Sequence, residues 1–140
     1  MLPLRVVIDT NVLISAAIKP AGLQRTVLVL AMTKPMRWYV SRSIVQEYRE
    51  VLAHPELRIR KGLRHQLLQL IKNRSYSVSP KRRLEVARDP DDNIFVECAD
   101  AAGADYLVTG NQRDFPRLWK KTKIISPREF ITMIAPHLIK

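Results

Sequence analysis

The sequence predicts an α/β fold in which helices cover both faces of a parallel sheet. Short apolar runs of strand length alternate with helical segments along the whole chain. Parallel neighbours need long crossover connections, so this alternation favours a parallel sheet that is buried on both faces. The 140 residues, of which 46% are hydrophobic, are enough for a sizeable core, and we expect one domain over residues 1–140.

The first third of the chain predicts one strand and two helices. Leu4–Ile8 ends in a β-branched run and is typical of a buried strand. A helix should follow to about Ile18, with Thr10 or Asn11 as its cap. A second, mostly apolar helix is predicted over Leu23–Met32.

The middle of the chain predicts two strands and two helices. Arg37–Val40 is the second strand, and Ser41 should cap a helix that runs to about Ala53. Gly62–Lys72 has the apolar stripe of a further helix, and Ser75–Val78 is a weak strand candidate.

The last third begins with a polar stretch, SPKRRLEVARDPDD, whose two prolines indicate a loop. The remaining predicted elements are a helix over Asn93–Ala102, strands over Tyr106–Val108 and Lys123–Ile125, and a helix that Ser126–Glu129 opens as a capping box and that extends towards Ala135.

The charge balance favours a polyanionic partner. Lysine and arginine number 24 against 13 acidic residues, a formal net charge of +11. A positive surplus of this size favours nucleic-acid binding, because binding releases counterions from the phosphates. A need for solubility, or the charge bias of thermophilic proteins, would explain the surplus as well. Cys98 is the only cysteine, no apolar run reaches about 18 residues, and no signal-peptide pattern is present. We therefore expect a cytoplasmic protein without a membrane span.

Asp9 is the first candidate functional residue, because it ends a buried strand. A desolvated carboxylate is costly unless something pairs with it. In parallel sheets, ligands bind at the carboxyl ends of the strands, which is where Asp9 is expected.

Other acids could meet Asp9 there. On the helix after Ser41, Glu47 borders the apolar face and Glu50 points further out, although Glu47 could equally be a surface residue. Asp91 and Asp92 precede the apolar helix from Asn93, and spacing does not choose between them.

A second strand end also delivers polar oxygens. Asn111 follows the strand that ends in YLVT, and Asp114 lies three residues further on, although both residues are also common in turns. Carboxylates that converge repel one another, and divalent cations remove that conflict. An acidic cluster in a basic chain therefore predicts metal-dependent phosphate chemistry with Mg²⁺ or Mn²⁺.

Four stretches resemble the PIN-domain ribonucleases, in particular toxin components of toxin–antitoxin pairs. They are VVIDTNVLISA (6–16), SRSIVQEYREVL (41–52), DPDDNIFVECADAAGADYLVTGNQRDF (89–115) and IISPREFI (124–131). The resemblance implies a three-layer α/β/α sandwich around a parallel sheet, and acids that bind Mg²⁺ or Mn²⁺ and hydrolyse RNA. It also implies a cognate antitoxin and a homodimer.

Matched residue by residue, the resemblance implies Asp9, Glu47 and Asp92 as catalytic metal ligands, and it prefers Asp92 to Asp91. Asn11 and Thr109 match supporting residues. Asn111 stands where many relatives have Asp, so Asn111 or Asp114 would serve a second, weaker metal site.

Three basic residues near these motifs, Arg42, Arg113 and Arg117, are candidates for contacting RNA phosphates. Two other functions stay open. A PIN-like protein with a weakened catalytic centre would bind nucleic acid without cleaving it, and Asn111 favours that reading. A structure-specific DNA nuclease would use similar chemistry, but the short chain shows no long insertion to arch over a flap.

Overall fold

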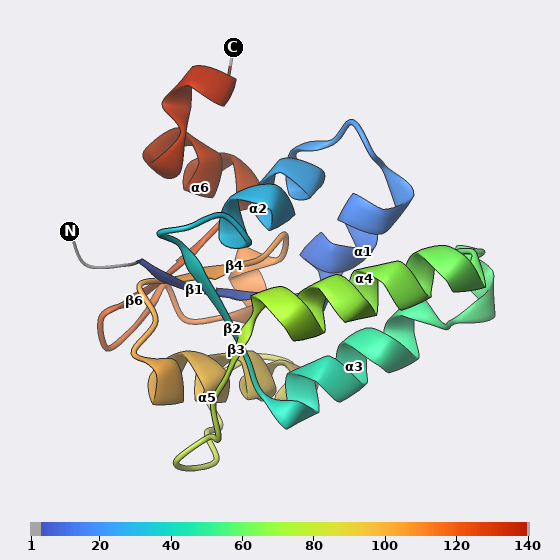
Figure 1. The fold of residues 1–140 in the computed structure, drawn as a ribbon. Coiled ribbons are helices and arrows are strands. Elements are labelled where there is room, and N and C mark those ends of the chain that lie inside the picture. The colour runs from blue at the N-terminus through green and yellow to red at the C-terminus, as the bar shows by residue number, and fades with distance from the viewer. Residues whose placement is uncertain (1–3, 140) are drawn as a thin grey trace.

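A computed structural model describes residues 4–139, and its centre is a sheet with the strand order β3-β2-β1-β4-β6-β5 (Figure 1). Neighbouring strands are parallel, except that β5 runs antiparallel to β6. The strands are β1 (Arg5–Ile8), β2 (Arg37–Val40), β3 (Tyr76–Ser77), β4 (Tyr106–Val108), β5 (Leu118–Trp119) and β6 (Thr122–Ile125).

Helices cover both faces of this sheet. α5 packs against β1, β2 and β4, while α2 and α6 lie together on the opposite side (Figure 1). On that side Phe130 of α6 meets Tyr106 of β4 edge to face, with 6.1 Å between ring centroids. The predicted three-layer α/β/α fold is thus confirmed. The helices are α1 (Thr10–Ile18), α2 (Leu23–Ala31), α3 (Arg42–Leu52), α4 (Lys61–Arg74), α5 (Asn93–Ala102) and α6 (Pro127–Ile134).

The two central strands end side by side. Val6, Val7 and Ile8 of β1 are fully buried, as the β-branched run predicts for a strand covered on both faces. The ladder between β1 and β4 continues one residue further, because the N–H of Asp9 donates to the carbonyl of Val108 at 3.0 Å. The first polar residues after these strands therefore lie next to each other.

α3 forms where its N-cap and its apolar face predict a helix. The Ser41 hydroxyl accepts a hydrogen bond from the N–H of Ile44 at 3.3 Å, so Ser41 is the N-cap. Ile44, Tyr48 and Leu52 are spaced four residues apart and form one buried face. α3 and α4 lie alongside each other and extend beyond the sheet (Figure 1).

Two predictions of local structure are wrong. The N-cap of α1 is Asp9 and neither Thr10 nor Asn11, because Asp9 keeps extended backbone while Thr10 already begins the helix. Leu118–Trp119 forms β5, although no strand is predicted between Val108 and Lys123; this two-residue strand is too short and too exposed to leave an apolar pattern.

The segment before α5 contains the predicted loop, and side chains of α5 hold it in place. The N–H groups of Val86 and Ala87 both donate to Oδ1 of Asn93, at 2.9 and 2.8 Å, and the N–H of Leu84 donates to Glu97. The loop is therefore fixed immediately ahead of Asp92.

Within residues 4–139 no single helix combines the length and apolar composition that crossing a membrane requires; only α1 and α2 taken together, bent by 116°, satisfy that test.

Candidate active site

Asp9 is the most buried acid at the carboxyl edge of the sheet. Its side chain leaves the end of β1, and the residue is only 4% exposed. Burial raises the pKa of the Asp9 carboxyl, and a hydrogen bond of 2.7 Å from the Thr109 hydroxyl to Oδ2 counteracts part of that rise. The carboxylate therefore has a fixed orientation and little water around it.

The turn after β4 supports Asp9 from the neighbouring strand. Thr109 is fully buried, and its hydroxyl also accepts a hydrogen bond from the N–H of Asn111 at 3.0 Å. Asn11 of α1 accepts from the N–H of Gly110 at 3.2 Å. Thr109 and Asn11 thus hold the turn against β1 and α1, which is the geometry that supporting residues need.

Glu47 reaches the same edge from α3. Its side chain is half-buried, and its Oε2 accepts a hydrogen bond from the hydroxyl of Thr10. Burial raises the pKa of the Glu47 carboxyl, the Thr10 bond lowers it, and the charge of Asp9 raises it further. Glu50 is exposed and pairs with Gln46 of its own helix at 3.1 Å. Of the two glutamates, Glu47 is the one near Asp9.

Tyr48 is a positioning residue that sequence reasoning missed. Its ring is fully buried, and its hydroxyl donates to the carbonyl oxygen of Ile8 at 2.5 Å. This bond joins α3 to the last residue of β1, so it fixes Glu47 relative to Asp9. The available signal was a tyrosine in an otherwise aliphatic stripe, directly after a candidate acid.

Asp92 joins the group from the N-terminus of α5, and the structure separates it from Asp91. Burial and then the charges of Asp9, Asp89, Asp114 and Glu47 raise the pKa of Asp92 to about 7. Asp91 is exposed, and its N–H is bound by the Asp89 carboxylate. The charges of both Asp9 and Glu47 act on the partly desolvated Asp92, whereas the exposed Asp91 contributes through its charge, which raises the pKa of Glu47.

The supporting role of the Asn93 side chain was not predicted either. It is buried at the start of α5, accepts from two loop N–H groups, and donates to the carbonyl of Pro90 at 3.2 Å. It thereby orders the segment that delivers Asp92. A lone asparagine beside three aspartates gave no sequence signal for this role.

The two candidates for a fourth oxygen ligand differ in their surroundings. Asn111 is exposed, and its backbone N–H donates a hydrogen bond to the Thr109 hydroxyl. Asp114 is half-buried, and its charge raises the pKa of both Asp9 and Asp92. By its effect on these two pKa values, Asp114 belongs with the acids of the candidate active site. Arg42, Arg113 and Arg117 are all exposed, and Arg42 begins α3.

The donor chemistry of this cluster fits a hard cation. Its side chains are carboxylates that raise one another's pKa, and a divalent cation with oxygen ligands relieves that repulsion. In the arrangement described for residues 4–139, no three His, Cys, Asp or Glu side chains are already poised to hold a metal ion together. Asp9 and Glu47 are instead each hydrogen-bonded to a threonine hydroxyl.

Comparison with known proteins decides the family. A family model described as the PIN domain matches residues 5–113. The chain belongs to the PIN domain family. PIN-domain proteins are nucleases, and the matched range contains Asp9, Glu47, Asp92 and Asn111. Asp114 lies just beyond it.

One protein is similar to this PIN domain in sequence, and two solved structures are similar to it in fold. An uncharacterised protein of Methanocaldococcus jannaschii is 33% identical, over 91% of this chain and 90% of that protein. The fold is similar to a chain of VapBC2 from Rickettsia felis bound to a DNA fragment from its promoter, with a TM-score of 0.62, 16% identity, and 88% and 98% of the two chains covered. FitAB bound to an IR36 DNA fragment gives a TM-score of 0.56 at 16% identity, over 87% and 94%.

Proposed function

We propose that this PIN domain is a metal-dependent ribonuclease that hydrolyses RNA phosphodiester bonds. The observation that carries the proposal is the electrostatic coupling of three acids from β1, α3 and α5, which burial and mutual repulsion hold at raised pKa. Perturbed acids that cluster at strand ends are typical of active sites. The net charge of +11 around this acidic group supports an anionic substrate.

Asp9, Glu47 and Asp92 would hold Mg²⁺ or Mn²⁺, and Asp114 or Asn111 would serve a weaker second position. A divalent cation supplies charge that acidifies a water molecule and offsets the charge on the leaving oxygen. Thr109 keeps one Asp9 oxygen oriented, and Thr10 does the same for Glu47. With its pKa near 7, Asp92 would change protonation state close to neutral pH.

Three exposed arginines would contact the substrate outside this acidic group. Arg113 and Arg117 lie on either side of Asp114 in the chain, and Arg42 begins the helix that carries Glu47. As guanidinium groups they match the geometry of phosphate oxygens. We propose that they bind phosphates on each side of the bond that is cleaved.

The test is cleavage of a labelled single-stranded RNA with Mn²⁺ or Mg²⁺, using Asp92→Asn and Asp91→Asn as a matched pair. Loss of supporting residues around a metal costs about 10–100-fold, so loss of a ligand should lower the rate by at least about 100-fold. Asp91→Asn should cleave like the unaltered chain. Equal rates for the two variants would refute the assignment of Asp92, and RNA binding without any cleavage would favour the weakened-centre alternative.

The same assay with DNA of identical sequence separates the nuclease classes. A ribonuclease should leave the DNA strand intact at the same salt concentration. Faster cleavage of DNA, single-stranded or branched, would favour a DNA nuclease.

We further propose a toxin role with a cognate antitoxin, a homodimeric state and a cytoplasmic location. The resemblance of the motifs supports the antitoxin, as does the similarity of the fold to VapBC2 and FitAB. Expression alone should arrest growth, and co-expression with the product of the adjacent gene should restore it. Unimpaired growth would contradict the toxin role, and a monomeric mass by light scattering would contradict the dimer.

A further inference from the structure

A second surface on this chain has the chemistry of a polyanion site. An open groove of about 910 Å³ lies between α3, α4 and the extended segment that follows α4. We call it the α3–α4 groove. It is lined by Val40 and Ser41 at the end of β2, by one side each of α3 and α4, and by Ser75, Ser77, Val78 and Ser79.

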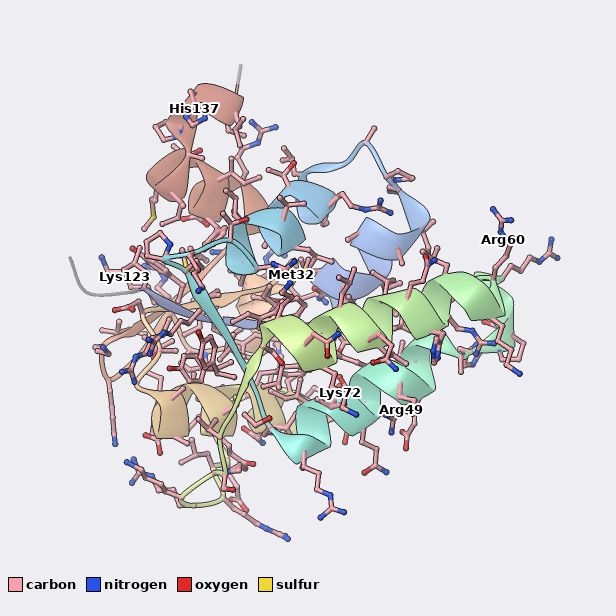
Figure 2. The ribbon with its side chains drawn as sticks, in the orientation of Figure 1. Met32, Arg49, Arg60, Lys72, Lys123 and His137 are labelled. Carbon is pink, nitrogen blue, oxygen red and sulfur yellow. The ribbon has the colours of Figure 1, made fainter. Side chains whose placement is uncertain are left out.

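The groove carries unpaired positive charge. Arg42 and Arg49 come from α3 and Lys72 from α4, and all three are exposed. In residues 4–139 the ion pairs involve Asp100 and Asp105, so none of these three cations is paired. Figure 2 shows Arg49 and Lys72 on the two neighbouring helices, far from Lys123 at the other end of the molecule. The single acid of the lining, Glu50, is bonded to Gln46.

Hydroxyl groups line the remaining side of the groove. Ser75, Ser77 and Ser79 alternate along the extended segment and all contribute to the lining. Tyr76, between them, packs instead against Tyr39 and lies under the guanidinium of Arg37. Because side chains alternate along an extended chain, the three hydroxyls share one side and can donate to anionic oxygens.

The groove shares α3 with the candidate active site. α3 carries Glu47 on the side that meets α1, and Arg42, Gln46 and Arg49 on the groove side. The serine-rich segment leads into the loop that ends at Asp92. Val40 and Ser41 of the lining stand at the carboxyl end of β2, the neighbour of β1, so the groove begins at the same edge of the sheet as Asp9 but across α3 from Glu47.

We propose that the α3–α4 groove binds the sugar–phosphate backbone of the RNA strand as it leaves the cleavage site. This inference rests on the proposed ribonuclease function. Arg42 and Arg49 are seven residues apart, about 10 Å along the helix, so they contact different phosphates. No Phe, Tyr or Trp is among the described lining residues and His65 supplies the one aromatic ring there, so we expect binding to depend little on sequence.

A nucleic-acid strand suits this groove better than an acidic peptide. Its positive groups and hydroxyls are distributed along both walls and the end, matching a ligand that carries a charge at every repeat unit. Val40, Val45, Leu68 and Val78 also line it, so the preference for a nucleic-acid strand rests on the distribution of charge alone. An acidic partner protein is the outcome that the experiment must exclude.

The experiment measures RNA binding without divalent cations, by fluorescence anisotropy over a range of salt concentrations. The variant is Arg49→Ala with Lys72→Ala, and the control is Lys34→Ala with Lys123→Ala, which removes the same charge from exposed positions elsewhere. Two single-stranded RNAs are compared, of about 5 and about 20 nucleotides. All the substituted residues are exposed, and thermal melting confirms that both double variants fold.

We expect the groove variant to bind the long RNA about 10-fold more weakly, with the slope of log K against log salt reduced by about 1.4. Its binding of the short RNA, and its cleavage of that RNA with Mn²⁺, should match the control. The swap Arg49→Lys with Lys72→Arg should restore binding of the long RNA.

Equal affinities of the groove variant and the control for the long RNA would overturn the proposal. So would a polyglutamate chain that binds more tightly than the long RNA and loses that binding in the groove variant. A chain that binds long RNA through the groove but cleaves nothing would contradict the ribonuclease function and leave the groove assignment standing.

Discussion

The hydroxyl of Thr109 donates a hydrogen bond of 2.7 Å to the carboxylate of Asp9, a residue 100 positions earlier in the chain. The two residues meet because β1 and β4 are parallel neighbours that end together. Their contact fixes the most buried acid of the candidate active site.

Replacing Thr109 by Val should lower the free energy of unfolding and leave the Asp9 carboxylate less firmly held. The change leaves the Asp9 carboxylate and the N–H of Asn111 without their hydroxyl partner, at a cost of about 1–3 kcal/mol in the free energy of unfolding. Urea denaturation measures this loss. Thr109→Ser keeps the hydroxyl and should stay within about 1 kcal/mol of the original. A Val variant as stable as the Ser variant would show that the bond does not matter.

Stability without metal should fall as the pH rises from about 4 to about 7. The pKa of Asp92 is about 7 in the folded chain, above its ordinary value of 3.8, so the folded state binds more protons than the unfolded state in that interval. Asp92→Asn should weaken this dependence, to which Asp9 and Glu47 with their raised pKa values also contribute, and should melt at a higher temperature than the original at pH 8 while losing cleavage. Melting curves from pH 4 to 9 test this, and a lower melting temperature for Asp92→Asn at pH 8 would contradict it.

Tyr48→Phe should lower activity more than stability explains. The variant keeps the ring but leaves the carbonyl of Ile8 unpaired, costing about 1–3 kcal/mol, and it frees α3 from β1. Cleavage should fall about 10–100-fold at a temperature where the variant is fully folded. Tyr106→Phe, whose ring also packs in the interior, is the control and should cleave normally.

The two candidates for the fourth ligand should respond differently to substitution. Asp114→Asn should raise the Mn²⁺ concentration for half-maximal activity about 10-fold, because its charge reaches Asp9 and Asp92. Asn111→Ala keeps the backbone N–H that donates to the Thr109 hydroxyl, so it should change the Mn²⁺ concentration for half-maximal activity little. The reverse order would assign the position to Asn111.

Acid should destabilise the protein through Asp100. Burial alone would raise the pKa of this carboxyl, but hydrogen bonds from Arg82, Lys120 and Trp119 outweigh it and lower the pKa to about 2. The stabilisation is thus complete above pH 4 and is lost as the pH falls from about 4 to about 2. Asp100→Ala should cost about 1–3 kcal/mol at pH 7 and little at pH 2, whereas Glu85→Ala, an exposed control, should cost nothing measurable.

The helices and most strands were predictable because their signals are local. Ser41 and Ser126 cap the helices they precede, and the β-branched run of β1 is buried as expected. The short β5 was missed because Leu118 is 55% exposed and only its pairing with β6 makes it a strand.

The candidate acids were predictable as types but their arrangement was not. Helical spacing places Asp91 and Asp92 on equally good stripes, and only the path of the loop held by Asn93 buries one of them. Likewise, the contacts of Thr10 with Glu47 and of Tyr48 with Ile8 depend on how α1, α3 and β1 pack.

The position of β4 in the sheet bears on when activity can arise during synthesis. β4 lies between β1 and β6, so the strand that brings Thr109 to Asp9 has both neighbours only after residues 122–125 have been made. A ribosome still translating the message would therefore carry an unfinished site. If the chain is a ribonuclease, we expect products that end before residue 122 to be inactive, because β4 then lacks one of its two neighbours.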